Sequence, residues 1–323
     1  MENLSAGQKL TRAFDKVGEQ TSLHLTLGLD ATPAELIALS KDDKDPLDAK
    51  TARFVSGMEI SYDVTSKKAI GKTGEKDVTG QRIALSGPDG ELLELRIIGK
   101  DALYARADLQ QFADLTGEKM PSAAEIPPEA GALGDFFEGD WIKLDLAKLE
   151  KFSKEMEKQG AAAGAVPGLG TPSLSPETGK KLFKDLKKAF AGEVTLKNKG
   201  EVDGLDQVTA TANARSLVDV LFDAVSPYAK DLGMPGEFPK PTAKDLKDIP
   251  NKRVAVDFFL KDGALDSASV NLGVLTAEKD DDLGLKAEFG EADAVEAPSG
   301  AAELDIEQIA QAMMGSKGAG LDY

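Results

Sequence analysis

The sequence predicts an α+β protein built on one large, mostly antiparallel β-sheet with helices on one side. Two patterns lead to this prediction: apolar and polar residues alternate in several short segments, and turn residues join many neighbouring segments directly as hairpins. The long helical crossovers that a parallel sheet requires are rare. With 41% hydrophobic residues, the 323-residue chain carries enough apolar side chains to bury a sizeable core.

The first half of the chain is predicted to open with a helix and to continue as strands. Residues 5–17 carry apolar residues at helical spacing, and Ser5 is a suitable N-cap. In residues 23–29 a leucine occupies every second position, so one face of this strand is predicted to be buried. Later strands of this half are predicted at 58–65, 83–97 (a hairpin turning at 87–90), 103–106 and 141–144, with a charged connection at 40–50 and a proline-rich loop at 121–128.

The second half repeats this style after a central segment of different composition. A helix is predicted to start at Asp145, and residues 160–176, which are rich in Gly, Ala and Pro and carry no charge, are predicted to be a flexible loop. Another helix begins at Ser175 and Pro176, which suit the N-cap and the first helical position. Strands are predicted at 194–199, 208–212, 254–261, 267–275 and 283–289, and helices at 216–228 and 303–314.

Composition and motifs argue against nucleic-acid binding and against catalysis. The net charge of −17 repels phosphate backbones, so nucleic acid is not expected as a partner. The only histidine, His24, lies on the polar side of the first predicted strand, and no zinc, nucleotide-binding or nucleophile-elbow motif occurs. The acidic clusters at 42–45 and 280–282 lack the spacing of a calcium loop. We therefore expect no cofactor, no metal and no enzymatic activity.

Three segments occur in an order that is typical of one protein family. They are Leu103–Arg106, Gly139–Leu144 and Phe289–Pro298, the last of which ends in Val-Glu-Ala-Pro. Together with the opening helix and the leucine-rich strand, they resemble the LppX, LprG and LolA/LolB family of bacterial lipoproteins and carriers. The resemblance implies a half-barrel, in which a single large curved antiparallel sheet has helices packed on its concave side.

The same resemblance implies the organisation and the location of the protein. Residues 1–300 would form the half-barrel domain, with the flexible loop at 160–176, and residues 301–323 would form a C-terminal helix and tail. The family carries a lipid-acceptor cysteine before the opening helix, so we expect that cysteine upstream of Glu2, in a segment outside this sequence. The protein would then be extracytoplasmic and attached to the cell membrane through a lipid anchor.

The resemblance further implies that the protein binds or carries a lipid or a lipidated glycan in an apolar cavity. The candidate cavity residues are Leu23, Leu25, Leu27, Leu29, Val254, Val256, Phe258, Leu182, Phe183 and Leu186. An ordinary hydrophobic core is the alternative for all of them. In that case the protein would be a non-catalytic interaction or sensor protein of the cell envelope, built on the same scaffold without a ligand cavity. The oligomeric state is not predicted.

Overall fold

The computed structural model describes most of the chain. The described residues are 4–41, 44–74, 76–116, 131–148, 151, 178, 181–182, 184–185, 194–229, 240–275 and 283–305. The predicted loops at 121–128 and 160–176 and nearly all of the predicted C-terminal helix at 303–314 lie outside them.

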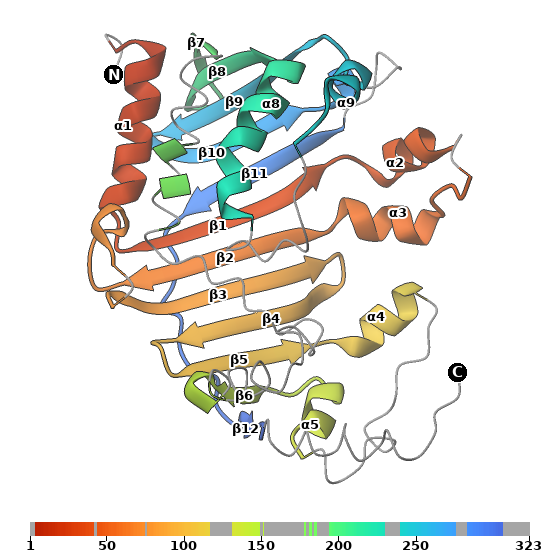
Figure 1. Ribbon diagram of the computed structural model, residues 1–323, viewed down its shortest axis with the longest axis vertical. Helices are drawn as coiled ribbons and strands as arrows, with labels where there is room; N and C mark the ends of the chain where they lie inside the picture. Colours follow the sequence, from red (N-terminus) through yellow and green to blue (C-terminus); the bar gives the residue numbers. More distant parts are fainter. Residues whose placement is uncertain are drawn as a thin grey trace.

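The described strands form a single twelve-stranded sheet that is not closed into a barrel (Figure 1). The strands are β1 (Ser22–Asp30), β2 (Glu59–Ser66), β3 (Val78–Gly87), β4 (Gly90–Ile98), β5 (Ala102–Ala107), β6 (Ile142–Asp145), β7 (Thr195–Val202), β8 (Leu205–Asn213), β9 (Arg253–Lys261), β10 (Ala264–Asn271), β11 (Gly284–Gly290) and β12 (Ala302–Glu303). Their spatial order is β12-β6-β5-β4-β3-β2-β1-β11-β10-β9-β8-β7. Every predicted strand is therefore present, although the predicted strand at 267–275 ends at Asn271 and continues as a 3-10 turn.

The sheet is mixed, not purely antiparallel, because its last strand is parallel to its neighbour. Ala302 and Glu303 pair in parallel with Ile142 and Lys143 of β6, whereas all other neighbouring strands are antiparallel. The sheet thus extends into the segment that the sequence assigns to a C-terminal helix and tail. With only two residues, β12 is too short to show the alternation that predicts a strand.

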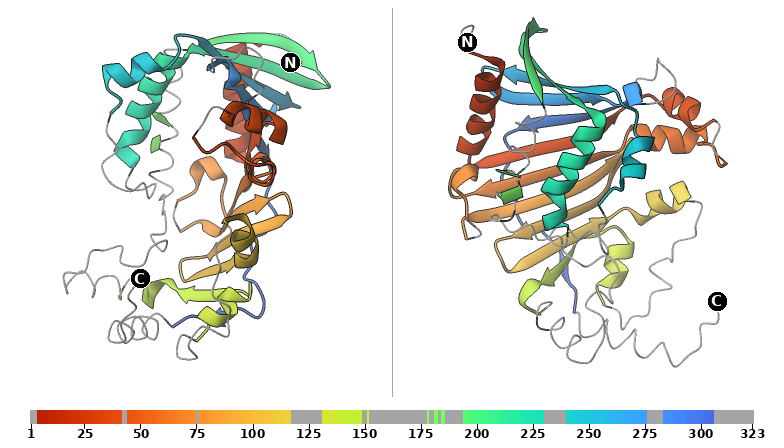
Figure 2. Two further views of the ribbon diagram at one scale, coloured as in Figure 1. Left: turned by 90° about the vertical axis from the view of Figure 1, so that its right-hand side faces the viewer. Right: turned by 45° about the horizontal axis from the view of Figure 1, so that its top comes forward.

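The two halves of the chain belong to one sheet because they meet at its centre. The first strand, β1, pairs with β2 on one side and with β11, from the end of the second half, on the other. Leu27 lies opposite Ile60 of β2 and Ala287 of β11. Figure 2 shows the result as a twisted and bent sheet. Two separate domains joined at the Gly/Ala/Pro segment are excluded for the described strands.

Helices flank this sheet. They are α1 (Ala6–Glu19), α2 (Pro33–Ser40), α3 (Ala49–Ser56), α4 (Leu109–Thr116), α5 (Leu133–Phe137), α8 (Ala214–Val225) and α9 (Ala243–Asp248), with 3-10 turns η1 (Ile70–Lys72), η4 (Ser226–Tyr228) and η5 (Gly273–Leu275). Ser5 caps α1 in a reciprocal capping box with Gln8, as its predicted N-cap role requires. The short helices α2, α3, α4, α5 and α9 were not predicted, because five to eight residues show little periodicity. Local signals for α2 and α3 are the caps Thr32 and Asp48, and Pro33 in the first turn of α2.

The sheet has an apolar face and a polar face, as the alternation in the strands predicts. We call the side that carries Leu25 and Leu27 the apolar face, and the side that carries Asp63 and Arg82 the polar face. One cross-strand row of the apolar face consists of Leu27, Ile60, Leu85, Leu93 and Ala107, which lie on β1 to β5. Figure 1 views the apolar face, with α8 in front of the sheet and the extended segment between β11 and β12 passing behind it.

Two hydrophobic clusters cover the apolar face near the two edges of the sheet. At one, Leu10 and Ala13 of α1 pack on Val208 and Leu260, and Phe14 meets Phe258 edge to face with ring centres 6.2 Å apart. At the other, residues of β5, β6 and the β12 region bury one another; they are Leu103, Ala105, Ala132, Ile142, Leu144 and Leu304. The middle strands lie between these clusters.

Candidate functional site

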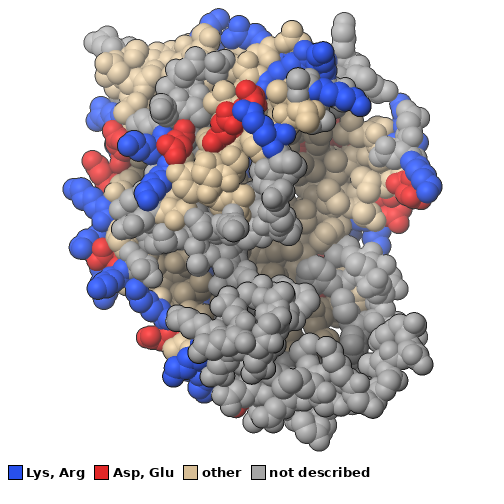
Figure 3. Space-filling view, viewed as in Figure 1, with Lys and Arg blue, Asp and Glu red and all other residues tan. Residues whose placement is uncertain are grey.

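Large apolar side chains remain exposed in the middle of the apolar face. Leu27 and Ile60, which are direct cross-strand neighbours, are each 46% exposed, and Leu285 of β11 is 47% exposed. Leu285 lies opposite Leu29, two residues along β1 from Leu27. We call Leu27, Ile60 and Leu285 the apolar patch. The space-filling view shows a hollow of uncharged residues in this face (Figure 3).

The apolar patch lies toward one end of the strands. Leu27 is late in β1, whereas Ile60 and Leu285 are early in β2 and β11. Because these strands are antiparallel, all three residues lie toward the same strand ends, near α2 and α3. The opposite strand ends are covered, since α1 packs there against β10 and η1. An uncovered apolar surface is unfavourable in water, and contiguous surfaces of this kind mark binding sites.

The predicted cavity residues fall into two groups with different surroundings. Leu23, Leu25, Leu27 and Leu29 of β1 share the apolar face with Val254, Val256 and Phe258 of β9, and β11 and β10 separate the two strands. Val254 is only 3% exposed, and Phe258 packs against the α1 cluster, so this part of β9 belongs to the core. Leu27 is open to solvent.

The predicted lid helix is described only in part. Leu182 is helical and half-buried, whereas Phe183 and Leu186 lie outside the described residues. The Tyr228 hydroxyl, in the 3-10 turn η4 that follows α8, donates a hydrogen bond of 2.6 Å to Asp185. Sequence reasoning missed Ile60 and Leu285 as site residues. Both lie in predicted strands, at 58–65 and 283–289, but nothing in the sequence pattern marks them as uncovered.

The polar face carries a chain of ionic contacts that begins at the only histidine. His24 Nδ1 lies 2.5 Å from Asp63 Oδ1, its Nε2 lies 2.9 Å from the Thr26 hydroxyl, and Arg82 donates to Asp63 Oδ2 at 3.1 Å. The Asp63, His24 and Thr26 side chains are in the order of a catalytic relay. Thr26 nevertheless lies in the middle of a central strand, where the ladders to β2 and β11 use the backbone amides that would have to stabilise an oxyanion.

Glu94 is the centre of the rest of this network. Its side chain is 1% exposed and accepts hydrogen bonds from Arg82 and Arg96, both at 2.7 Å, and from Arg106 at 3.0 Å. Burial alone would raise the pKa of Glu94, but the hydrogen bonds and charges of the arginines outweigh it and lower the pKa to about 2. Glu91 contacts Arg82 and Arg106, and burial, reinforced by Glu94 nearby, raises the pKa of Glu91.

Trp141 and the segment after β11 complete the polar face. The guanidinium groups of Arg96 and Arg106 lie 4.8 Å and 5.0 Å from the centre of the Trp141 ring, within the range of cation–π contacts. Arg96 also donates to the backbone carbonyl of Glu296 at 3.0 Å. Trp141 therefore serves as a structural anchor for the two arginines.

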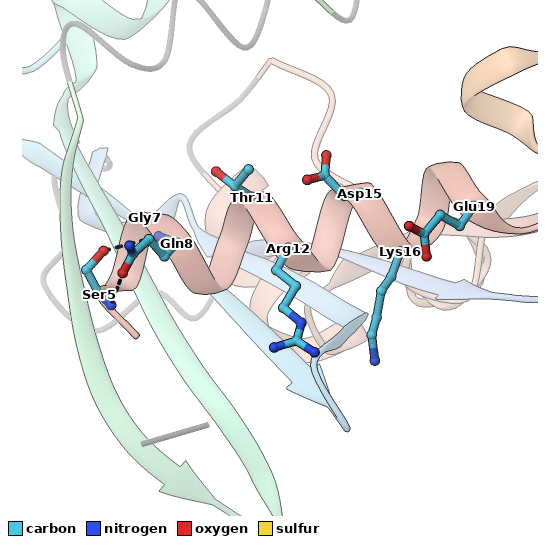
Figure 4. Close-up of a pocket in the computed structure, with 8 residues that line it drawn as sticks. All are labelled: Ser5, Gly7, Gln8, Thr11, Arg12, Asp15, Lys16 and Glu19. Atoms are coloured by element: carbon cyan, nitrogen blue, oxygen red, sulfur yellow. Dashed lines mark hydrogen bonds between the residues drawn. The ribbon is translucent and has the colours of Figure 1, made fainter. Parts of the chain in front are cut away.

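Polar pockets also occur among the described residues. One, of about 660 Å³, runs along α1, and its lining includes Arg12, Asp15 and Lys16 (Figure 4). Another, of about 560 Å³, lies where β4 begins and β5 ends, near α4 and α5. The described residues contain no cluster of three or more side chains suited to a metal ion, and none of their helices is long and apolar enough to cross a membrane.

Comparison with known proteins identifies a similar structure but no family. No family model and no curated protein matches the chain. Among solved structures, the lipoprotein LppX of Mycobacterium tuberculosis is similar: the alignment covers 90% of this chain and 96% of LppX, with 11% sequence identity and a TM-score of 0.32. At this level of similarity, the function of the chain has to be derived from its own residues.

Proposed function

We propose that this protein binds the acyl chain of a lipid on the apolar face of its sheet, with the apolar patch as the contact surface. One observation carries the proposal: Leu27, Ile60 and Leu285 are each nearly half exposed. They lie on the apolar face, which hydrophobic clusters cover on both sides of them. An aliphatic, low-aromatic lining favours a flexible apolar chain over a ring-shaped ligand.

The energy available is sufficient for such a ligand. Each methylene group transferred from water to an apolar environment contributes about 0.8 kcal/mol, so a chain of roughly sixteen carbons supplies on the order of 10 kcal/mol before the costs of association. Covering the exposed parts of Leu27 and Ile60 adds to this gain. The extracytoplasmic location, the lipid anchor and a role in carrying lipids between sites stay predictions of the family resemblance.

The test is the binding of a fluorescent fatty acid, cis-parinaric acid, to the purified protein, combined with native mass spectrometry for lipid that copurifies from the original host. A double substitution of Leu27→Ser and Ile60→Ser removes most of the contact surface. We expect the dissociation constant to rise about tenfold or more, because two partly buried aliphatic contacts contribute on the order of 1 kcal/mol each. The variant should stay folded, since both side chains are already half exposed.

Val202→Ser is the matched control. Val202 is 39% exposed, but it lies on the edge strand β7, far from the patch, so its substitution should leave fatty-acid binding unchanged. Equal binding by wild type and the double variant would refute the proposal. The proposal would also be refuted if the wild type were a dimer, the double variant a monomer, and lipid binding the same for both. The patch would then be a contact between two copies of the chain.

A further inference from the structure

The pocket of about 560 Å³ lies at the same end of the strands as the apolar patch. The register places the end of β1, the start of β2, the β3–β4 turn and the end of β5 side by side at this end. The pocket is lined there by residues of both faces: Leu93 and Ala107 from the apolar face, and Glu94 and Arg106 from the polar face. It therefore lies at the rim where the two faces meet.

A row of apolar residues connects the patch to this pocket. Leu27, Ile60, Leu85, Leu93 and Ala107 are successive cross-strand neighbours on β1 to β5, and the last two line the pocket. Neighbouring strands are about 4.8 Å apart, so the row is about 19 Å long, which suits an extended acyl chain. A lipid that lies along it would place its polar end at the pocket.

The polar groups of the pocket carry no spare positive charge. The Arg106 guanidinium already contacts Glu91 and Glu94 at 2.8 Å and 3.0 Å. Asp108 accepts hydrogen bonds from both the backbone and the side-chain nitrogen of Gln111, at 3.0 Å and 3.1 Å, and the exposed Glu138 adds another carboxylate. Such a lining repels phosphate and offers acceptors and amide donors to hydroxyl groups.

We propose that this pocket holds the headgroup of the bound lipid and selects an uncharged, hydroxyl-bearing headgroup over a phosphate-bearing one. The inference rests on the proposed function, since the acyl chain has to lie on the apolar face for its headgroup to reach the rim.

The experiment compares three amphiphiles that share one chain and differ in headgroup: dodecyl maltoside, dodecyl phosphocholine and dodecyl sulfate. Each is added below its micellar concentration to displace cis-parinaric acid from the full chain. We expect dodecyl maltoside to displace the probe at a concentration about tenfold lower than the other two, as one or two hydrogen bonds to charged or amide groups would provide.

Two substitutions in the lining assign the effect to the pocket. Gln111→Ala should reduce the advantage of dodecyl maltoside several-fold, and Glu138→Lys should improve displacement by dodecyl sulfate. Gln207→Ala, on β8 across the sheet, is the control and should change neither. Equal displacement by all three amphiphiles, or a maltoside advantage that survives Gln111→Ala, would overturn the headgroup inference alone. Failure of all three to displace the probe would overturn the proposed function.

Discussion

Removal of the charge of Glu94 is the sharpest test of what stabilises the polar face. In a Glu94→Gln variant, Arg82, Arg96 and Arg106 would lose the carboxylate that they share, inside a site where that side chain is 1% exposed. The fold lowers the pKa of Glu94 from 4.5 to about 2. A difference of this size corresponds to about 3 kcal/mol in favour of the charged form, and removing one partner of a buried ion pair typically costs about 3–5 kcal/mol.

We therefore expect Glu94→Gln to lower the free energy of unfolding by about 3 kcal/mol, measured by urea denaturation followed by circular dichroism. Glu91→Gln is the matched control from the same network. Glu91 is 33% exposed and its pKa is raised, so the fold gains little from its charge, and its loss should cost less than about 1 kcal/mol. Equal losses for the two variants, or no loss for Glu94→Gln, would refute the view that Glu94 organises the three arginines.

Further predictions concern pH and packing. Because the pKa of Glu94 is lower in the folded protein than in the unfolded chain, its contribution is complete above pH 4.5 and is lost as the pH falls toward about 2, so the stabilities of wild type and Glu94→Gln should converge over that range; a constant difference would contradict this. Gly80→Ala should cost about 1–3 kcal/mol by urea denaturation, since a Cβ there would lie 2.8 Å from Val295, whereas Gly290→Ala, with its nearest atom at 4.0 Å, should cost little. Leu10→Ala should lower the stability by about 2–5 kcal/mol, because this 8% exposed side chain holds α1 on the sheet, and a loss below about 1 kcal/mol would contradict that role.

Local patterns were enough to predict most elements of the fold. The strict alternation in residues 23–29 predicted β1, the Gly-Pro-Asp-Gly turn predicted the β3–β4 hairpin, and Ser5 predicted the start of α1, because each depends on neighbouring residues only. Helices α2 and α3 escaped prediction because they are short and pack against each other, so that tertiary contacts stabilise them.

The candidate site could be predicted only in part. Alternation assigns Leu27 and Val254 alike to an apolar face, and the sheet does place them on one face. Their exposures of 46% and 3% differ because other elements cover β9 and leave the later part of β1 open. Coverage depends on where distant helices pack, and strand periodicity carries no information about that.

By itself, the sequence determined which residues form strands β1 to β11, that alternating strands have one apolar side, and that the net charge is negative. Only the tertiary structure decided that β1 pairs with β11, that three arginines converge on Glu94, and that the apolar patch stays open beside a polar pocket. The physical reason is the separation along the chain. Alternation and turn chemistry act between neighbouring residues, whereas strand pairing, shared ion pairs and the covering of a sheet face by helices join residues that are far apart in the sequence.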